Sequence, residues 1–207
     1  PPPATTTLRS SSAASDVYKR QIQGTPLGAM HPATMMVRMM NMANGTNRAD
    51  PLQFNNVDAK LYGFDMDWRW QLSPSWSVSG LVNFVRGERR DVDDDLYRIA
   101  PANMTNRLTY AANRWDVTVE SVLYASQDRV SDASRELESA GYGTVNLHAR
   151  WQLSPALELA GGVDNVFDKT YRSHLGGYNR ARNPDVGIGE RLPGYGANIF
   201  ARVSYTF

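Results

Sequence analysis

An all-β, antiparallel fold is predicted by three features of this 207-residue sequence: a two-residue hydrophobic period, connections that alternate in length, and a repeated hairpin end. From Tyr62 onward about one residue in two is apolar, and the intervening residues are polar or small, which is the period of a strand. The pattern predicts about eight strands, near 17–24, 54–72, 75–88, 103–112, 114–127, 141–153, 156–167 and 196–207.

The alternation gives each strand one apolar and one polar face, which indicates two different surroundings. These segments are longer than the strands of a typical soluble sheet and fit tilted strands that cross a membrane. The apolar set, facing lipid, includes Trp70, Val117, Leu147 and Val203. The polar set, facing a lumen, includes Asp67, Glu120, His148 and Arg202.

The connections alternate between tight turns and long polar loops. Ser73-Pro74-Ser75, Ala112-Asn113-Arg114 and Ser154-Pro155-Ala156 are the turns, two of them with a proline that fixes φ. Loops are expected at about 24–53, 89–102, 128–140 and 168–195. Short turns at one end and long loops at the other are typical of outer-membrane barrels, which have short periplasmic turns and long extracellular loops in up-and-down order.

One hairpin end occurs twice. The run Arg-Trp-Gln-Leu-Ser-Pro at 69–74 recurs unchanged at 150–155. In both copies Trp and Leu fall on the apolar face just before the turn, where an interfacial aromatic girdle lies. The sequence therefore predicts part of an antiparallel transmembrane β-barrel; a chance match within a common style of hairpin would leave the hairpins themselves unchanged.

Composition excludes several classes of function. Lys and Arg nearly balance Asp and Glu, so the basic surface of a nucleic-acid binder is missing and no nucleic acid is expected as a partner. Without cysteine the chain has no disulfide, thiolate nucleophile or cysteine-based zinc site. No apolar run approaches the roughly 20 residues of a transmembrane helix.

Residues 1–21 differ from the rest of the chain. They are rich in Pro, Thr, Ser and Ala, a composition that cannot bury a core. They lack the apolar stretch of a signal peptide, and part of the run resembles translated sequencing-adaptor sequence. We expect 1–21 to be a disordered or non-native segment, with a natural flexible linker as the alternative, and 22–207 to be the barrel portion.

The end of the chain resembles the C-terminal end of TonB-dependent outer-membrane receptors. The resemblance lies in Gly162-Val163-Asp164-Asn165-Val166-Phe167-Asp168-Lys169 with Tyr171, in Pro193-Gly194, and in the last strand, which ends Tyr205-Thr206-Phe207. It implies a barrel of about 22 strands with an N-terminal plug and a TonB box, of which this chain would supply the last eight strands without the plug.

The resemblance also implies a function and partners. A TonB-dependent receptor in the bacterial outer membrane would import a metal chelate such as a ferric siderophore, or copper, and would do no chemistry on it. Its partners would be the TonB complex, reached through the N-terminal part, outer-membrane lipid, the metal-chelate ligand and the barrel-assembly machinery. Tyr205 and Phe207 would belong to the signal that this machinery reads. No cofactor is expected.

Methionine gathers in one segment, at 30–42. Thioethers beside an imidazole are a ligand set that suits Cu(I), in a segment that we expect to be an extracellular loop. The alternative is that flexible, apolar methionine packs this loop or forms an adaptable binding surface. The candidate metal ligands are Met30, His31, Met35, Met36, Met39 and Met40.

Other polar groups are weaker candidates. Asp91, Asp93, Asp94 and Asp95 form an acidic loop that could hold a hard cation or simply be solvated. His148 and His174 are expected to be ordinary hydrogen-bonded groups.

No motif such as GxSxG or HExxH places a nucleophile beside a base, so we do not expect an enzyme. A passive outer-membrane porin is the main alternative, and a soluble lipocalin-like binder is another.

Overall fold

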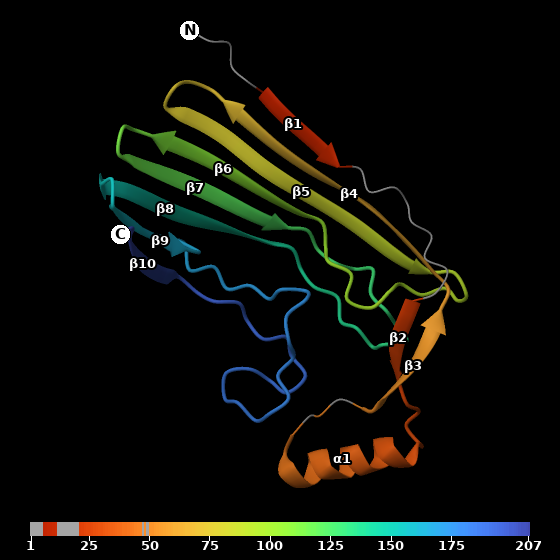
Figure 1. The fold of residues 1–207 in the computed structure, drawn as a ribbon. Helices are drawn as coiled ribbons and strands as arrows, with labels where there is room; N and C mark the ends of the chain where they lie inside the picture. Colours follow the sequence, from red (N-terminus) through yellow and green to blue (C-terminus); the bar gives the residue numbers. More distant parts are fainter. Residues whose placement is uncertain (1–5, 12–20, 47, 49) are drawn as a thin grey trace.

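The computed structural model describes residues 6–11, 21–46, 48 and 50–207. Eight strands form one antiparallel sheet in the order β1-β4-β5-β6-β7-β8-β9-β10, and β2 and β3 form a second, two-stranded sheet (Figure 1). The predicted all-β, up-and-down arrangement of a barrel portion is confirmed, with the sheet open at β1 and β10. The elements are β1 (Thr6–Ser11), β2 (Gln21–Pro26), α1 (Pro32–Asn44), β3 (Leu52–Val57), β4 (Ala59–Gln71), β5 (Trp76–Arg89), β6 (Asn103–Ala111), β7 (Trp115–Tyr124), β8 (Tyr142–Ser154), β9 (Leu157–Asp164) and β10 (Asn198–Tyr205).

The first two predicted strands differ most from the structure. The single strand expected at 54–72 is interrupted at Asp58, so that β3 pairs with β2 while β4 pairs with β5 and β1. Within the segment 1–21, residues 6–11 form β1, which pairs with the edge of β4, with Thr6 opposite Trp70. That the segment is disordered stays a prediction. Residues 1–5 and 12–20, and with them the start of the strand predicted near 17–24, lie outside the described residues. That the segment is non-native stays a prediction.

The register of the strands aligns residues of one kind across the sheet. From β4 to β10 one row runs Trp70, Val78, Leu108, Val119, Leu147, Val163 and Ile199, each directly opposite the next. The neighbouring row, on the other face, runs Arg69, Ser79, Arg107, Glu120 and Asn146. The two predicted faces are therefore present, since alternate residues of a strand point to opposite sides of a sheet.

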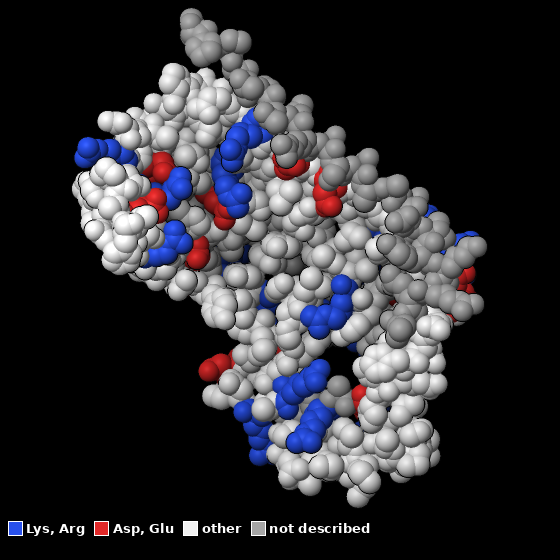
Figure 2. Space-filling view, viewed as in Figure 1, with Lys and Arg blue, Asp and Glu red and all other residues white. Residues whose placement is uncertain are grey.

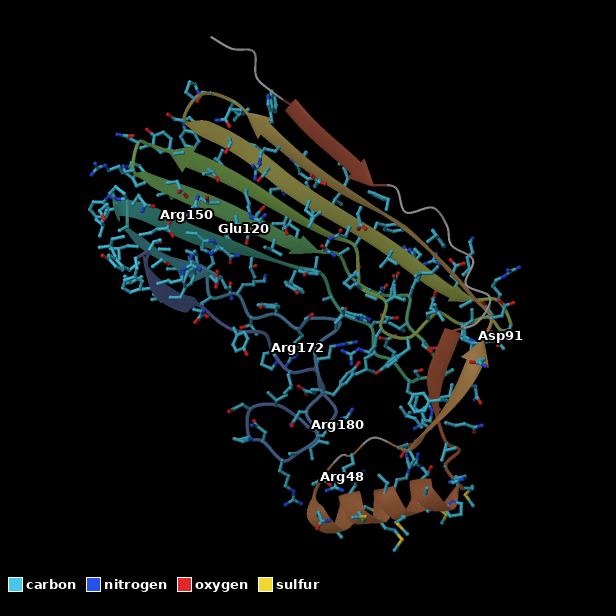
Figure 3. The ribbon with its side chains drawn as sticks, viewed as in Figure 1. Arg48, Asp91, Glu120, Arg150, Arg172 and Arg180 are labelled. Carbon is cyan, nitrogen blue, oxygen red and sulfur yellow. The ribbon has the colours of Figure 1, made fainter. Side chains whose placement is uncertain are left out.

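The polar face is bound together by hydrogen bonds between strands. Glu120 is buried and accepts hydrogen bonds from Arg107 Nε at 2.5 Å and Asn146 Nδ2 at 2.8 Å. His148 Nε2 lies 2.8 Å from Asp164 Oδ1, as expected for an ordinary hydrogen-bonded histidine. Basic and acidic side chains are interspersed over this face of the sheet (Figure 2), and Arg150 and Glu120 both project from it (Figure 3).

The two ends of the sheet differ in construction. The turns between β4 and β5, β6 and β7, and β8 and β9 all lie at one end, and the long loops lie at the other (Figure 1). At the turn end, the ring of Tyr110 lies between Trp76 and Trp115, with centroids 4.9 and 5.4 Å away. These aromatic rings gather at the same end of the sheet as Trp70 and Trp151 of the repeated hairpin end; that they form an interfacial girdle stays a prediction. Tyr205 and Phe207 also lie in ring contact, 5.0 Å apart.

A small apolar core lies at the loop end. Val57, Ala59 and Leu96 are its buried residues, and Leu61 and Ile99 pack against it. Gly87 lies beneath this core, and a Cβ there would come within 2.9 Å of Leu96. No helix of the described chain is long and apolar enough to cross a membrane.

Candidate functional site: a methionine-rich helix and the loops beside it

The methionine segment forms a helix, α1, and not the predicted loop. Pro32 occupies the first turn, and Ala33 N–H donates to the Nδ1 atom of His31, the N-cap residue, at 3.2 Å. The helix ends at Gly45, whose left-handed φ of 58° is readily adopted by glycine. Methionine and alanine are strong helix formers, so local sequence and both caps favour the same structure.

The sequence of this segment contains signals for both a loop and a helix. The segment has no strand-like alternation and lies between strands, which led to the prediction of an irregular loop. The pairs Met35–Met39 and Met36–Met40 are spaced four residues apart, and Gly45 follows the last turn. These signals, together with Pro32, would have predicted the helix.

The two sides of α1 have different roles. Thr34 is fully buried and donates its hydroxyl to Leu27 O, while Arg38 and Asn41 bond to the segment that follows the helix. At 100° per residue Met36 and Met39 fall opposite Thr34, Met35 and Met40 flank them, and Met42 falls nearer to Arg38. The side chains of Met30, Met35, Met36, Met39, Met40 and Met42 are exposed. Figure 3 shows sulfur atoms on the side of α1 that faces away from the sheet.

The structure therefore places Met35, Met36, Met39 and Met40 in one helix, with Met30 just before it, and gives His31 a role in capping that helix. While Nδ1 accepts the hydrogen bond from Ala33, the ring proton resides on Nε2. A metal at Nε2 would require that proton to leave or to move to Nδ1, where it would break the cap. The thioethers have no such competing role.

Asp50 fixes α1 to the loops. Its carboxylate accepts a hydrogen bond from Arg38 Nη2 at 2.7 Å and lies 3.3 Å from Arg135 Nη1, on the β7–β8 loop. The hydrogen bond from Arg38 holds the pKa of Asp50 below its usual value, and the charge of Arg135 acts in the same direction. The helix is thus attached through its polar side, which leaves the methionine side free of ion pairs.

A buried polar cluster joins three loops. Glu136 accepts hydrogen bonds from Arg98 N and Ser131 N, and its Oε1 lies 3.1 Å from His174 Nε2 in a poorly aligned ionic contact. His174 Nδ1 lies 3.0 Å from Ser139 Oγ, so His174 too is hydrogen-bonded as predicted. Arg191 donates to the carbonyl oxygens of His174 and Leu137.

Burial lowers the pKa of His174, and the neighbouring positive charge of Arg191 acts in the same direction, although Glu136 opposes both. Neither Glu136 nor Arg191 stood out in the sequence, because the loops that they join are far apart along the chain.

The acidic loop is part of the same scaffold. Asp94 accepts hydrogen bonds from Ser131 Oγ and Asp132 N, and Asp91 pairs with Arg89 at 2.6 Å. Asp91 lies at the loop end of the sheet (Figure 3). Within the described ranges no three His, Asp or Glu side chains converge as metal ligands. Asp91 and Asp94 thus bind an arginine, a hydroxyl and backbone amides.

A cavity of about 650 Å³ lies between the β7–β8 and β9–β10 loops. Tyr142 and Tyr171 stack on one wall with ring centroids 4.4 Å apart. The charged side chains that line the cavity are Lys169, Arg172 and Arg191, with Glu138 and Glu190, and Glu190 lies 3.3 Å from Arg172. Arg191 is buried and its Nε has no hydrogen-bond partner. Such a cavity can hold an organic anion.

The fold defines a class: an antiparallel membrane barrel wall, apolar on one face and polar on the other, with its loops gathered at one end. Residues 24–166 match the family described as TonB dependent receptor-like, beta-barrel. The chain belongs to this family, whose members are receptors and not enzymes, and it is part of an outer-membrane protein.

The relatives that this chain resembles are named for different transported compounds. The chain is 27% identical over 155 residues to the ferripyoverdine receptor of Pseudomonas aeruginosa, covering 68% of this chain and 18% of that protein. It is 28% identical over 157 residues to the vitamin B12 transporter BtuB of Vibrio vulnificus, covering 74% and 23%. The chain thus spans about a fifth of the length of these relatives.

Among solved structures, the copper transporter OprC matches with a TM-score of 0.70 and 26% identity over 75% of this chain and 25% of that one. The ferripyoverdine receptor matches with a TM-score of 0.54 and 18% identity over 81% of this chain and 22% of that one, a likeness of fold alone.

Proposed function

We propose that this chain is the C-terminal barrel portion of a TonB-dependent receptor that imports copper, and that the methionine side of α1 captures Cu(I) at the outer surface. The observation that carries the proposal is the exposed thioether face, held outward by a helix that is anchored through its other side. Cu(I) prefers soft sulfur donors to the oxygen donors of the loops. The likeness to a copper transporter supports the same cargo.

Helix spacing supports the ligand set. Residues three and four apart on a helix are neighbours, so Met35, Met36, Met39 and Met40 can offer two or three thioethers to one ion. Met30 and His31 immediately precede the helix. Because His31 caps the helix, we assign it a secondary role as ligand.

The test is Cu(I) binding by the full-length receptor, measured in competition with a chromophoric Cu(I) chelator. Replacing Met35, Met36, Met39 and Met40 together by leucine keeps the volume and helix propensity but removes sulfur. We expect binding to weaken more than tenfold, about 1.4 kcal/mol. The matched control replaces Met66 and Met104, which face outward from β4 and β6, by leucine, and should bind normally. Unchanged binding in the α1 variant would contradict the copper proposal.

A ferric chelate is the second candidate cargo, and the cavity beside Tyr142 and Tyr171 favours it. Two stacked tyrosines with Lys169, Arg172 and Arg191 suit a planar anionic ligand better than a bare cation. Growth on ferric chelates supplied one at a time, compared with growth under copper limitation, distinguishes the two. Uptake of a ferric chelate that is lost in Arg172→Ala but retained in the methionine variant would favour this candidate.

Transport by either route requires partners. We propose that the N-terminal part of the full protein receives energy from the TonB complex, and that the apolar face is embedded in outer-membrane lipid. Energy-coupled import, rather than the passive diffusion of a porin, is supported by membership of the receptor family.

The chain end carries a further part of this proposal. Phe207 follows the last strand, and its ring lies 5.0 Å from the ring of Tyr205. We propose that Tyr205 and Phe207 engage the barrel-assembly machinery. Deleting Phe207 from the full-length receptor should reduce its yield in outer-membrane fractions, measured by immunoblot. An unchanged yield would count against this role.

A further inference from the structure

The methionine side of α1 is also a surface that oxidants can reach. The exposed fraction is 84% for Met42, 82% for Met30, 70% for Met39 and 65% for Met36, against 48% for Met35 and 43% for Met40. Oxidation of a thioether depends on contact with a dissolved oxidant. Met66 and Met104 instead lie on the apolar face of the sheet, which lipid covers.

Oxidation here would change the surface without removing the support of the helix. The contacts that hold α1 come from Thr34, Arg38 and Asn41, which carry no sulfur. Both caps are likewise free of methionine, since His31 and Gly45 form them. The buried core at the loop end contains no methionine among its described members. An added oxygen atom would therefore project into water.

The chemistry is a transfer of one oxygen atom. A peroxide attacked by the sulfur lone pair gives up the outer oxygen, the O–O bond breaks, and the thioether becomes a sulfoxide. Sulfur loses two electrons, and hydrogen peroxide leaves as water. A sulfoxide is polar and presents a harder oxygen donor, so it binds Cu(I) less well than a thioether.

From this placement we propose that the methionine side of α1 is an oxidant-sensitive switch: peroxide converts it to sulfoxides and thereby closes the copper site, while the barrel and the helix persist. The inference rests on the proposed capture of Cu(I) by the same thioethers. It adds a regulation to that site, in which an oxidising exterior reduces the uptake of a redox-active metal.

The exposed fractions predict an order. Sulfoxide should form first at Met30 and Met42 and last at Met35 and Met40, with rates that differ by about twofold, because susceptibility follows exposure. Met66 and Met104 provide internal references and should oxidise least.

The experiment treats the full-length receptor, in outer-membrane vesicles, with graded hydrogen peroxide. Peptide mass spectrometry locates the sulfoxides, circular dichroism of the purified receptor follows the fold, and competition with a chromophoric chelator measures Cu(I) binding. We expect sulfoxide at α1, an unchanged spectrum and Cu(I) binding weakened more than tenfold. Methionine sulfoxide reductase, added with a thiol reductant, should restore binding.

The control is the receptor with Met30, Met35, Met36, Met39, Met40 and Met42 all replaced by leucine, in which any remaining Cu(I) binding should no longer respond to peroxide. Equal Cu(I) binding before and after complete oxidation of α1 would overturn the switch and leave the copper proposal standing. Loss of the fold upon oxidation would also overturn it. Absence of Cu(I) binding before any peroxide would instead overturn the proposed function, and the switch with it.

Discussion

The wall of the barrel and helix α1 both expose apolar side chains, but to different surroundings. In the wall, Leu147 belongs to an apolar row that crosses seven strands, on the face that we propose is embedded in lipid. In α1, Met36 and Met39 are exposed on a helix that stands at the loop end, away from the sheet (Figure 1). Exposed apolar side chains thus have two proposed roles in one chain. Those on the sheet contact lipid, and those on α1, away from the sheet, offer sulfur atoms as ligands.

The largest expected effect tests the wall. Replacing Leu147 by arginine places a charge in the lipid-facing row and should cost about 2–4 kcal/mol in the free energy of folding into a bilayer. Thr144→Arg, on the polar face of the same strand, is the matched control and should cost much less. Urea titrations of folding into lipid vesicles measure both. Equal costs would mean that the two faces share one environment.

A second, smaller effect concerns the loops and their dependence on pH. The pKa of His174 in the folded protein lies below the ordinary histidine value of 6.5, which applies to the unfolded chain. Between these two pKa values the unfolded state therefore binds more protons than the folded state. The contribution of neutral His174 to the free energy of unfolding is therefore complete above pH 6.5, and it is lost as the pH falls through the pKa of the folded state. The protection factors of the backbone amides of Ser131 and Glu136, which are the exchange rates corrected for the slower intrinsic exchange at low pH, should be smaller at pH 5 than at pH 7.

The charged groups around His174 define the control for that prediction. Glu136 and Arg98 act on the ring from two other loops and Arg191 from the same loop as His174, so all three share any electrostatic response. His174→Gln retains a hydrogen-bonding side chain but cannot titrate. It should flatten the pH dependence of the protection factors of these amides. An unchanged slope in His174→Gln would assign the effect to other groups.

The smallest effect tests the start of α1. His31→Ala removes the side chain that accepts from Ala33 N–H and should destabilise the helix by about 1 kcal/mol. His31→Asn supplies a good N-cap without an imidazole and should restore the helix. Hydrogen exchange of the α1 amides measures the first effect. If Cu(I) binding also survives in His31→Asn, the thioethers suffice as ligands; its loss there would make His31 a ligand.

The strands were largely predictable because their signals are local. Period-two alternation fixes which residues share a face, and Pro74 and Pro155 mark turns within a few residues of the strands that they join. The odd or even position of a residue within its strand is enough to predict its face. It places one set on one face of the sheet and the other set on the other face: Trp70, Val117, Leu147 and Val203, and Asp67, Glu120, His148 and Arg202. Helix α1 was missed although its signals are also local, since its position between strands outweighed its four-residue spacing.

By itself, then, the sequence determined the antiparallel wall, its two faces, the end at which the turns lie and the gathering of sulfur in one segment. Tertiary structure alone decided that the thioethers face outward, because Asp50 and Leu27, and not the methionines, hold the helix. It also decided that Glu136, His174 and Arg191 meet. The two hydrogen bonds that Arg191 donates to backbone carbonyls in this cluster join residues 17 and 54 positions apart in the sequence. Periodicity records the surroundings of neighbouring residues, whereas contacts between distant loops depend on how the whole sheet places their ends.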